Sequence, residues 1–127
     1  LSDIGIVCYY RGDYNKAVEL LKDSFSILKD ITGADDLILY ATYLCLAYKA
    51  LGKEFDKNKI YKLIQEAEDI KFVIYYRLYE LLDDSSYLET AYNQIQEKAD
   101  NLEPDIAAKF LSYPIPKAIV EKWEKVK

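Results

Sequence analysis

Apolar residues recur at helical spacing along the whole chain. The segment 14–31, for instance, places five of them on one helical face: Ala17, Leu20, Leu21, Phe25 and Leu28. The segment 36–51 is apolar on almost every side, which is typical of a helix that lies between neighbouring helices. The alternating pattern of a half-buried strand is not seen in the sequence. The pattern therefore predicts an all-α fold.

Turn and capping residues divide this pattern into separate helices. Gly12 and Asp13 form a turn pair, Gly33 is expected to end a helix as a left-handed cap, and Gly52 is expected to end the next helix. Asp35 can begin the third helix, because a carboxylate accepts hydrogen bonds from the free N–H groups of a first turn. Six helices are therefore expected, over residues 1–11, 14–31, 36–51, 57–70, 72–82 and 86–102.

Asp56 is a candidate cap for the helix that begins at residue 57. Near the C-terminus, Pro104 and Pro116 each fit the first turn of a further short helix, where the missing proline N–H is not needed. The last helix carries an apolar stripe at helical spacing, formed by Ile119, Val120 and Trp123. We expect this stripe to cover the exposed end of the preceding helices.

A pattern of large and small residues occurs three times at first-helix positions. The three copies are Leu1-x-x-Ile4-Gly5-x-x-Cys8, Ala41-x-x-Leu44-Cys45-x-x-Tyr48 and Tyr75-x-x-Leu78-Tyr79-x-x-Leu82. The second and third copies lie 34 residues apart, and the first and second lie 40 apart. Where two helices cross closely, only a small residue leaves room for a bulky neighbour. The expected small members are Gly5, Ala17, Cys45 and Ala91, and the expected large members are Leu21, Tyr48, Ile64 and Ile95.

Over residues 1–102 the chain resembles the tetratricopeptide (TPR) repeat family. The first copy is the most specific match, since Gly12-Asp13-Tyr14 precedes Ala17; the others depart from the family pattern, with Ile60 and Tyr79 where small residues are usual. The resemblance implies an α-α superhelix, a solenoid of about three hairpins over residues 1–31, 36–70 and 72–102. Residues 104–127 would form a C-terminal cap, and the whole would be one domain.

The tail from Phe110 to Trp123 resembles the end of TPR regions in bacterial multidomain signalling ATPases and nucleotide cyclases. The chain begins with Leu1 rather than Met. We therefore expect a fragment of a longer protein.

The resemblance implies a non-catalytic module that binds a peptide or helix of a partner protein, or of its own parent chain, in a concave groove. The groove would be lined by first-helix residues that face away from the second helices: Tyr9, Thr42, Tyr43, Leu46, Lys49, Tyr76 and Glu80. Within this set, Tyr9, Tyr43 and Tyr76 could form an aromatic shelf for the bound segment. The alternative is that these tyrosines simply pack the seams between hairpins. The family's chaperone-binding clamp is absent, because Ser2, Ile6, Thr42 and Leu46 occupy its positions.

Charge argues against nucleic acid as the partner. The 127 residues carry a net charge of −5, and nucleic-acid binding requires a basic surface. The local lysine cluster at residues 53–62 is interrupted by Glu54 and Asp56. No apolar run is long enough to span a bilayer, and no signal peptide is visible. We therefore expect a cytoplasmic protein that binds neither nucleic acid nor membrane.

Candidate catalytic chemistry is sparse. The sequence has no histidine, and its two cysteines, Cys8 and Cys45, lie inside apolar helical runs. The acidic pairs at 35–36 and 83–84 fall at turns or helix starts, where carboxylates offset the helix dipole. The sequence predicts no enzyme activity, metal or cofactor. Self-association, or a regulatory role within a larger signalling enzyme, is the alternative function.

Overall fold

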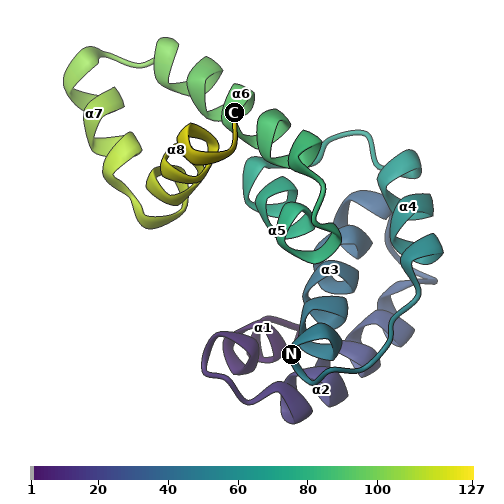
Figure 1. Cartoon of the computed structure of the whole chain (residues 1–127). Helices are drawn as coiled ribbons and strands as arrows, with labels where there is room; N and C mark the ends of the chain where they lie inside the picture. Colours follow the sequence, from purple (N-terminus) through teal and green to yellow (C-terminus); the bar gives the residue numbers. More distant parts are fainter. Residues whose placement is uncertain (1) are drawn as a thin grey trace. The chain divides into compact units, whose positions relative to one another are not determined.

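The computed structural model describes residues 2–127, and within them it forms eight helices and no strand (Figure 1). The helices are α1 (Ser2–Tyr10), α2 (Tyr14–Leu28), α3 (Ala34–Ala50), α4 (Lys57–Glu66), α5 (Phe72–Leu82), α6 (Ser85–Asp100), α7 (Pro104–Ser112) and α8 (Pro114–Val126). The prediction of an all-α chain of helical hairpins is confirmed. Leu1 and the side chain of Ser2 lie outside the described residues.

The chain divides into two compact units, where the sequence analysis expected a single domain. The first unit ends at Ile70 and contains α1–α4, and the second is Lys71–Lys127 and contains α5–α8.

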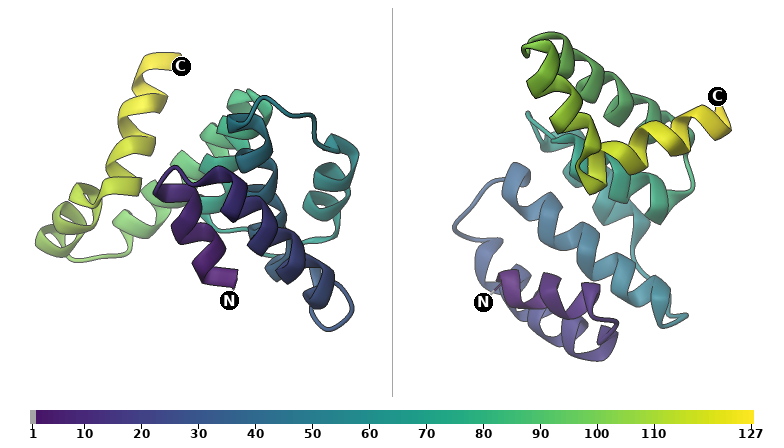
Figure 2. Two further views of the ribbon diagram at one scale, coloured as in Figure 1. Left: turned by 90° about the horizontal axis from the view of Figure 1, so that it is seen from below. Right: turned by 90° about the vertical axis from the view of Figure 1, so that its left-hand side faces the viewer.

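In the first unit, α1 and α2 form a hairpin, and α3 packs against both (Figure 2). Gly5 lies where α1 meets α2: a Cβ atom at Gly5 would stand 2.7 Å from Cγ of Leu21, a side chain with 0% exposure. This small-against-large contact was predicted from the sequence, and it explains why α1 and α2 approach so closely. In the second predicted hairpin the large members, Tyr48 and Ile64, are only half-buried.

In the second unit, α5 and α6 form a hairpin, while α7 and α8 pack against α6. One buried core cluster of this unit consists of Leu88, Ala91, Ile95, Ala99, Phe110 and Ile119. Aromatic side chains surround it: Phe72 lies edge-on to Phe110, and Tyr92 lies 5.8 Å from Trp123 between ring centroids. The expected covering role of the C-terminal helix agrees with this packing, because Ile119 of α8 has no exposed surface.

Several helix ends differ from the sequence prediction. The left-handed glycines are Gly12 and Gly52, with φ of 82° and 72°. Gly33 instead adopts an extended conformation, with φ −92° and ψ 179°, and is the N-cap residue of α3. The prediction of a left-handed cap at Gly33 is therefore wrong. α8 begins at Pro114, and Pro116, which was expected in the first turn of a short helix, is its third residue and lies in that turn.

The fourth helix is shorter than expected, because it ends at Glu66 and not near Ile70. Asp35 binds the chain just beyond this end. Its carboxylate accepts hydrogen bonds from the exposed backbone N–H groups of Glu68 (2.7 Å) and Asp69 (3.3 Å). Asp35 was predicted to cap α3, but it lies inside the first turn of that helix and caps this distant segment instead.

Candidate binding pocket

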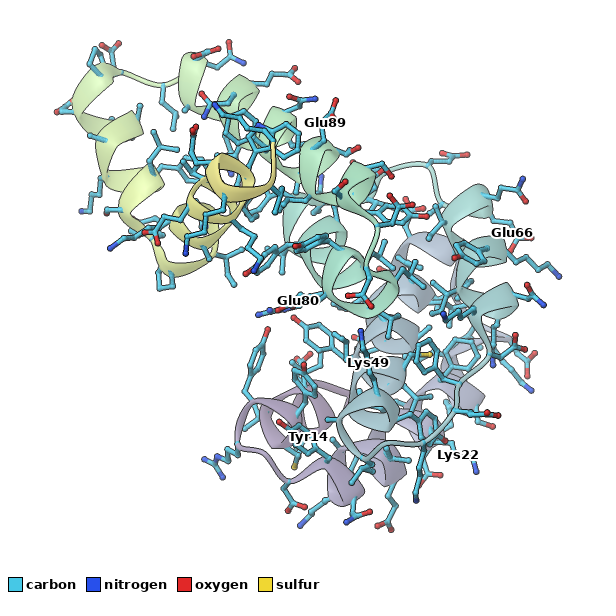
Figure 3. The ribbon with its side chains drawn as sticks, in the orientation of Figure 1. Tyr14, Lys22, Lys49, Glu66, Glu80 and Glu89 are labelled. Carbon is cyan, nitrogen blue, oxygen red and sulfur yellow. The ribbon has the colours of Figure 1, made fainter. Side chains whose placement is uncertain are left out.

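A cluster of tyrosines joins α1, α2 and α3 in the first unit. The ring of Tyr9 lies 5.5–5.6 Å from those of Tyr10, Tyr14 and Tyr43, and Tyr14 is marked in Figure 3. The hydroxyl groups of Tyr10 and Tyr43 form a 2.5 Å hydrogen bond. Edge-to-face contacts of this kind stabilise packing between helices. The cluster therefore favours the alternative that Tyr9 and Tyr43 pack a seam.

The other predicted groove residues of the first unit differ in exposure. Thr42, Tyr43 and Leu46 expose 0%, 3% and 5% of their surfaces. The Thr42 hydroxyl donates to the backbone oxygen of Ile38 in its own helix, at 2.6 Å. Lys49, one turn further on, is exposed. The first unit contains five of the predicted groove residues, and three of them, Thr42, Tyr43 and Leu46, therefore offer a partner almost no side-chain surface.

The remaining predicted groove residues, Tyr76 and Glu80, lie on α5 of the second unit. The Tyr76 ring stacks on Tyr79, and Glu80 accepts a 2.7 Å hydrogen bond from Arg77. Burial, together with the negative charge of Glu80, raises the pKa of Tyr76, so its phenol stays protonated at neutral pH. Because Tyr76 belongs to a different unit from Tyr9 and Tyr43, the shelf of three tyrosines remains a prediction.

A pocket with a volume of about 310 Å³ opens elsewhere in the first unit, between α2, α3 and the start of α4. Its apolar lining comes from all three segments: Phe25 from α2, Cys45 and Tyr48 from α3, and Phe55 from the loop before α4. The remaining lining residues are Lys22, Ser26, Lys29, Leu44, Asp56 and Lys59. Phe25 and Cys45 are buried, while Tyr48 and Phe55 are half-buried. The pocket therefore combines an apolar floor with a polar edge.

Local sequence explains how these side chains converge. Lys22 and Phe25 on α2 and Lys29 at its C-cap are spaced i, i+3 and i+7, so they lie on one helical face. Asp56 is the N-cap of α4 and accepts hydrogen bonds from the backbone N–H groups of Asn58 (3.0 Å) and Lys59 (3.3 Å). This cap was predicted, and it fixes the position of the first turn that carries Lys59.

The edge of the pocket is basic. The three exposed lysines, Lys22, Lys29 and Lys59, face a single carboxylate, that of Asp56. The ammonium group of Lys59 lies 4.0 Å from the centroid of the Phe25 ring, in cation–π geometry. Within residues 2–127, no ion pair involves any of these three lysines. Positive charge therefore collects here on a chain whose net charge is −5.

The thiol of Cys45 forms part of the pocket floor. Burial raises its pKa to about 12; the nearby charge of Lys59 acts in the opposite direction but is the weaker effect. The thiol is therefore protonated at neutral pH, and a protonated thiol is a poor nucleophile. In this pocket Cys45 serves as a small apolar side chain, as the sequence analysis expected.

A second, shallower pocket lies between the start of α3 and the end of α4, lined by Gly33, Ala34, Asp35, Glu66 and Glu68. Its central carboxylate, Asp35, already binds two backbone N–H groups. In the described part of the chain, no three residues of types His, Cys, Asp or Glu are arranged to hold a metal ion. Nor does any helix of residues 2–127 combine the length and apolar character needed to cross a bilayer.

The lysine pocket, whose edge is formed by Lys22, Lys29 and Lys59, was not predicted from the sequence. The only lysine cluster recognised in the sequence is that at residues 53–62, whose members share one stretch of the chain. The usable signal was the spacing of Lys22, Phe25 and Lys29 on α2. Lys59 could not be added to that group without the tertiary packing of α4.

Comparisons with known protein families, curated proteins and solved structures gave no match to this chain. The resemblance to TPR repeats is therefore neither supported nor contradicted by them.

Proposed function

We propose that this chain is a non-catalytic protein-interaction module that binds a segment of a partner polypeptide. The observation that carries the proposal is the open pocket in the first unit, which is lined by aromatic side chains and has exposed lysines at its edge. Concave apolar surfaces with a few convergent polar groups are the usual form of a binding site.

The size of the pocket favours a polypeptide over a compact small molecule. At about 310 Å³ it stands at the lower limit of typical small-molecule sites. It would hold one or two side chains, while the rest of a bound segment would lie on the neighbouring surface. Aromatic anchors in such pockets supply much of the binding energy in protein interfaces.

The chemistry of the pocket does not favour catalysis. Its one thiol is protonated at neutral pH, and its one carboxylate is engaged with the backbone of α4. General acid–base catalysis needs a group that is free to exchange a proton with the substrate. Binding of a polypeptide segment needs no such proton-exchanging group, so the lining residues of the pocket suit a binding role.

The test is a selection from a displayed library of random twelve-residue peptides, with a Ser26→Trp variant as the counter-selection target. Ser26 is exposed and lines the pocket, so an indole at this position should fill the space without disturbing the core. We expect peptides that bind the natural chain with micromolar affinity in calorimetry and bind the variant at least tenfold more weakly. Failure to enrich any peptide that distinguishes the two proteins would refute the proposal.

Self-association is a second candidate function, and one observation favours it. Three large apolar residues spaced three apart on α1 are about half exposed: Ile4, Val7 and Tyr10. Exposed apolar stripes of this kind often form interfaces. If two copies associate through α1, sedimentation equilibrium should detect a dimer that Val7→Asp abolishes. A chain that stays monomeric up to millimolar concentration would exclude this candidate.

A further inference from the structure

The charged residues around the pocket indicate what kind of polypeptide segment the pocket binds, and this inference rests on the proposed function. Lys22 lies on α2 and Lys29, seven residues further on, is the C-cap residue of that helix, so Phe25 lies between them in the sequence. At a rise of 1.5 Å per residue, their Cα atoms stand about 10 Å apart along the helix axis. Their ammonium groups can therefore reach both edges of the apolar floor.

Lys59 adds a third positive charge from a different segment. Its ammonium group lies over the Phe25 ring, 4.0 Å from the centroid, so the charge is held at the floor and not far out in solvent. Asp56 is the one carboxylate that lines the pocket, and it accepts two backbone hydrogen bonds at the start of α4. Three cations against one carboxylate leave the pocket with an excess of positive charge.

The floor itself is apolar. Phe25, Cys45 and Tyr48 come from two packed helices, and Phe55 covers one side from the loop. Aromatic ring faces and a protonated thiol offer little to a bound anion, but they favour burial of a large aliphatic or aromatic side chain. The pocket thus offers apolar contact at its centre and positive charge at its edge.

From this arrangement we propose that the pocket binds an acidic segment of a partner protein, in which a large apolar side chain enters the floor and flanking Asp or Glu side chains pair with Lys22, Lys29 and Lys59. A terminal carboxylate is a single group, whereas these lysines surround the floor from two helices. Carboxylates on both sides of the anchoring residue can pair with these separated lysines, whereas the single carboxylate of a chain end can reach fewer of them.

Nucleic acid fits the same surface less well. The lysines lie around one open pocket and do not form a track along the protein, whereas a nucleic-acid backbone needs a continuous basic path. The overall charge of −5 would also repel a polyanion at long range. A short acidic segment needs only the local positive patch.

The probe for the experiment is the tightest peptide from the library, compared with its neutral analogue in which each acidic residue is replaced by the corresponding amide. Binding is measured by calorimetry to the natural chain, to single variants Lys22→Gln, Lys29→Gln and Lys59→Gln, and to the triple variant. Exposed ion pairs contribute modestly, so we expect each single change to weaken binding about two- to fivefold and the triple change at least tenfold. The neutral analogue should bind more weakly by a similar factor, and added salt should reduce the difference.

The matched control is the triple variant Lys53→Gln, Lys57→Gln and Lys62→Gln. It removes the same charge from exposed lysines of the same unit that do not line the pocket. We expect it to bind within twofold of the natural chain, and circular dichroism should show that both triple variants remain folded. Equal weakening by the two triple variants would overturn the proposal, because it would indicate a general charge effect.

The remaining outcomes separate this inference from the proposed function. If library peptides bind but neither the pocket lysines nor the acidic residues matter, the acidic specificity is wrong and the interaction module stands. If binding is lost when the peptide's C-terminal carboxylate is amidated, a chain end is the true ligand and the inference fails. If no peptide is enriched but a single-stranded oligonucleotide binds in a way that depends on the pocket lysines, both proposals fail.

Discussion

The two units of this protein are each built around one helix, and these two central helices differ in how they are held. α3 contacts α1, α2 and α4, while α6 contacts α5, α7 and α8. α3 buries eight of its 17 residues, whereas α6 buries only four of its 16. The four in α6 form one stripe, Leu88, Ala91, Ile95 and Ala99. α3 is therefore a core helix with many buried faces, and α6 is an amphipathic helix with one.

The N-terminal caps of the two helices differ in the opposite sense to their burial: α6 has a side-chain cap and α3 has none. α6 begins after Asp84, whose side chain accepts a 2.9 Å hydrogen bond from the backbone N–H of Ser86. α3 begins after Gly33, which has no side chain to form such a bond. The helix with more buried surface thus has the weaker cap. We infer that packing fixes α3, whereas α6 depends on its cap and on the helices that cover its single stripe.

The largest expected effect comes from removing part of that cover. Deletion of residues 114–127 removes α8, including the fully buried Ile119 and the Trp123 ring that lies against Tyr92. Loss of two large apolar side chains from a core costs about 4 kcal/mol or more, so the stripe on α6 should become exposed. Hydrogen exchange would report this as lost protection in α6, and size exclusion as aggregation. A monomeric truncated chain with α6 still protected would show that α6 needs no cover from α8.

The next effect tests the close contact that is special to the first unit. In Gly5→Ala, the new methyl group would stand 2.7 Å from Cγ of the buried Leu21. Overpacking costs about 1–3 kcal/mol and outweighs the helix propensity gained, so we expect a net loss of about 1–2 kcal/mol in denaturant unfolding. The control is the double variant with Leu21→Ala, where the clash is removed. Additive costs of the two changes would contradict a direct contact between these positions.

The fold was largely accessible from the sequence, because helical spacing and turn residues act locally. Gly52 and Asp56 were assigned correctly, since a glycine stop and an acidic cap depend on residues within one turn. Gly33 and Asp35 were not. Asp35 binds backbone groups 33 and 34 residues away, and no local pattern reveals such a partner.

The candidate site was less accessible, for the same reason. Tyr43 was chosen for its place on a first helix, but its burial among Tyr9 and Tyr10 depends on how α1 packs on α3. The lysine pocket joins Lys22 and Lys59, which are distant in sequence and meet only after α4 is in place. Periodicity predicted which residues lie in helices and not which faces stay open.

A smaller effect tests the cap of α6. Asp84→Ala removes the side-chain acceptor, and loss of an N-cap costs about 1 kcal/mol, which thermal unfolding should detect. Hydrogen bonds from Ser86 lower the pKa of Asp84 below its usual value. The stabilisation is therefore present above the unfolded pKa, near 3.9, and is lost as the pH falls through the lower folded pKa.

Asp84→Asn separates the two contributions of this cap. The amide oxygen can still accept from Ser86, but the side chain no longer titrates. We expect Asp84→Asn to keep most of the stability at neutral pH and to lose less than the natural chain on acidification below about pH 4. Identical pH profiles for the natural and Asn chains would show that the charge of Asp84 contributes nothing to the cap.

The smallest effect reverses the comparison by giving α3 the cap that it lacks. Gly33→Ser places a hydroxyl at an N-cap position whose backbone is already extended, and a Cβ atom there meets no other atom within 4 Å. A serine cap exceeds a glycine cap by only a few tenths of a kcal/mol, so we expect a small gain in chemical unfolding at an unchanged m-value. Gly33→Ala is the matched control, since it adds the same Cβ without an acceptor and should not stabilise. If Gly33→Ser gives no gain and Gly33→Ala is tolerated equally well, packing alone fixes the start of α3 and a cap adds nothing. The difference between α3 and α6 would then extend to their N-termini.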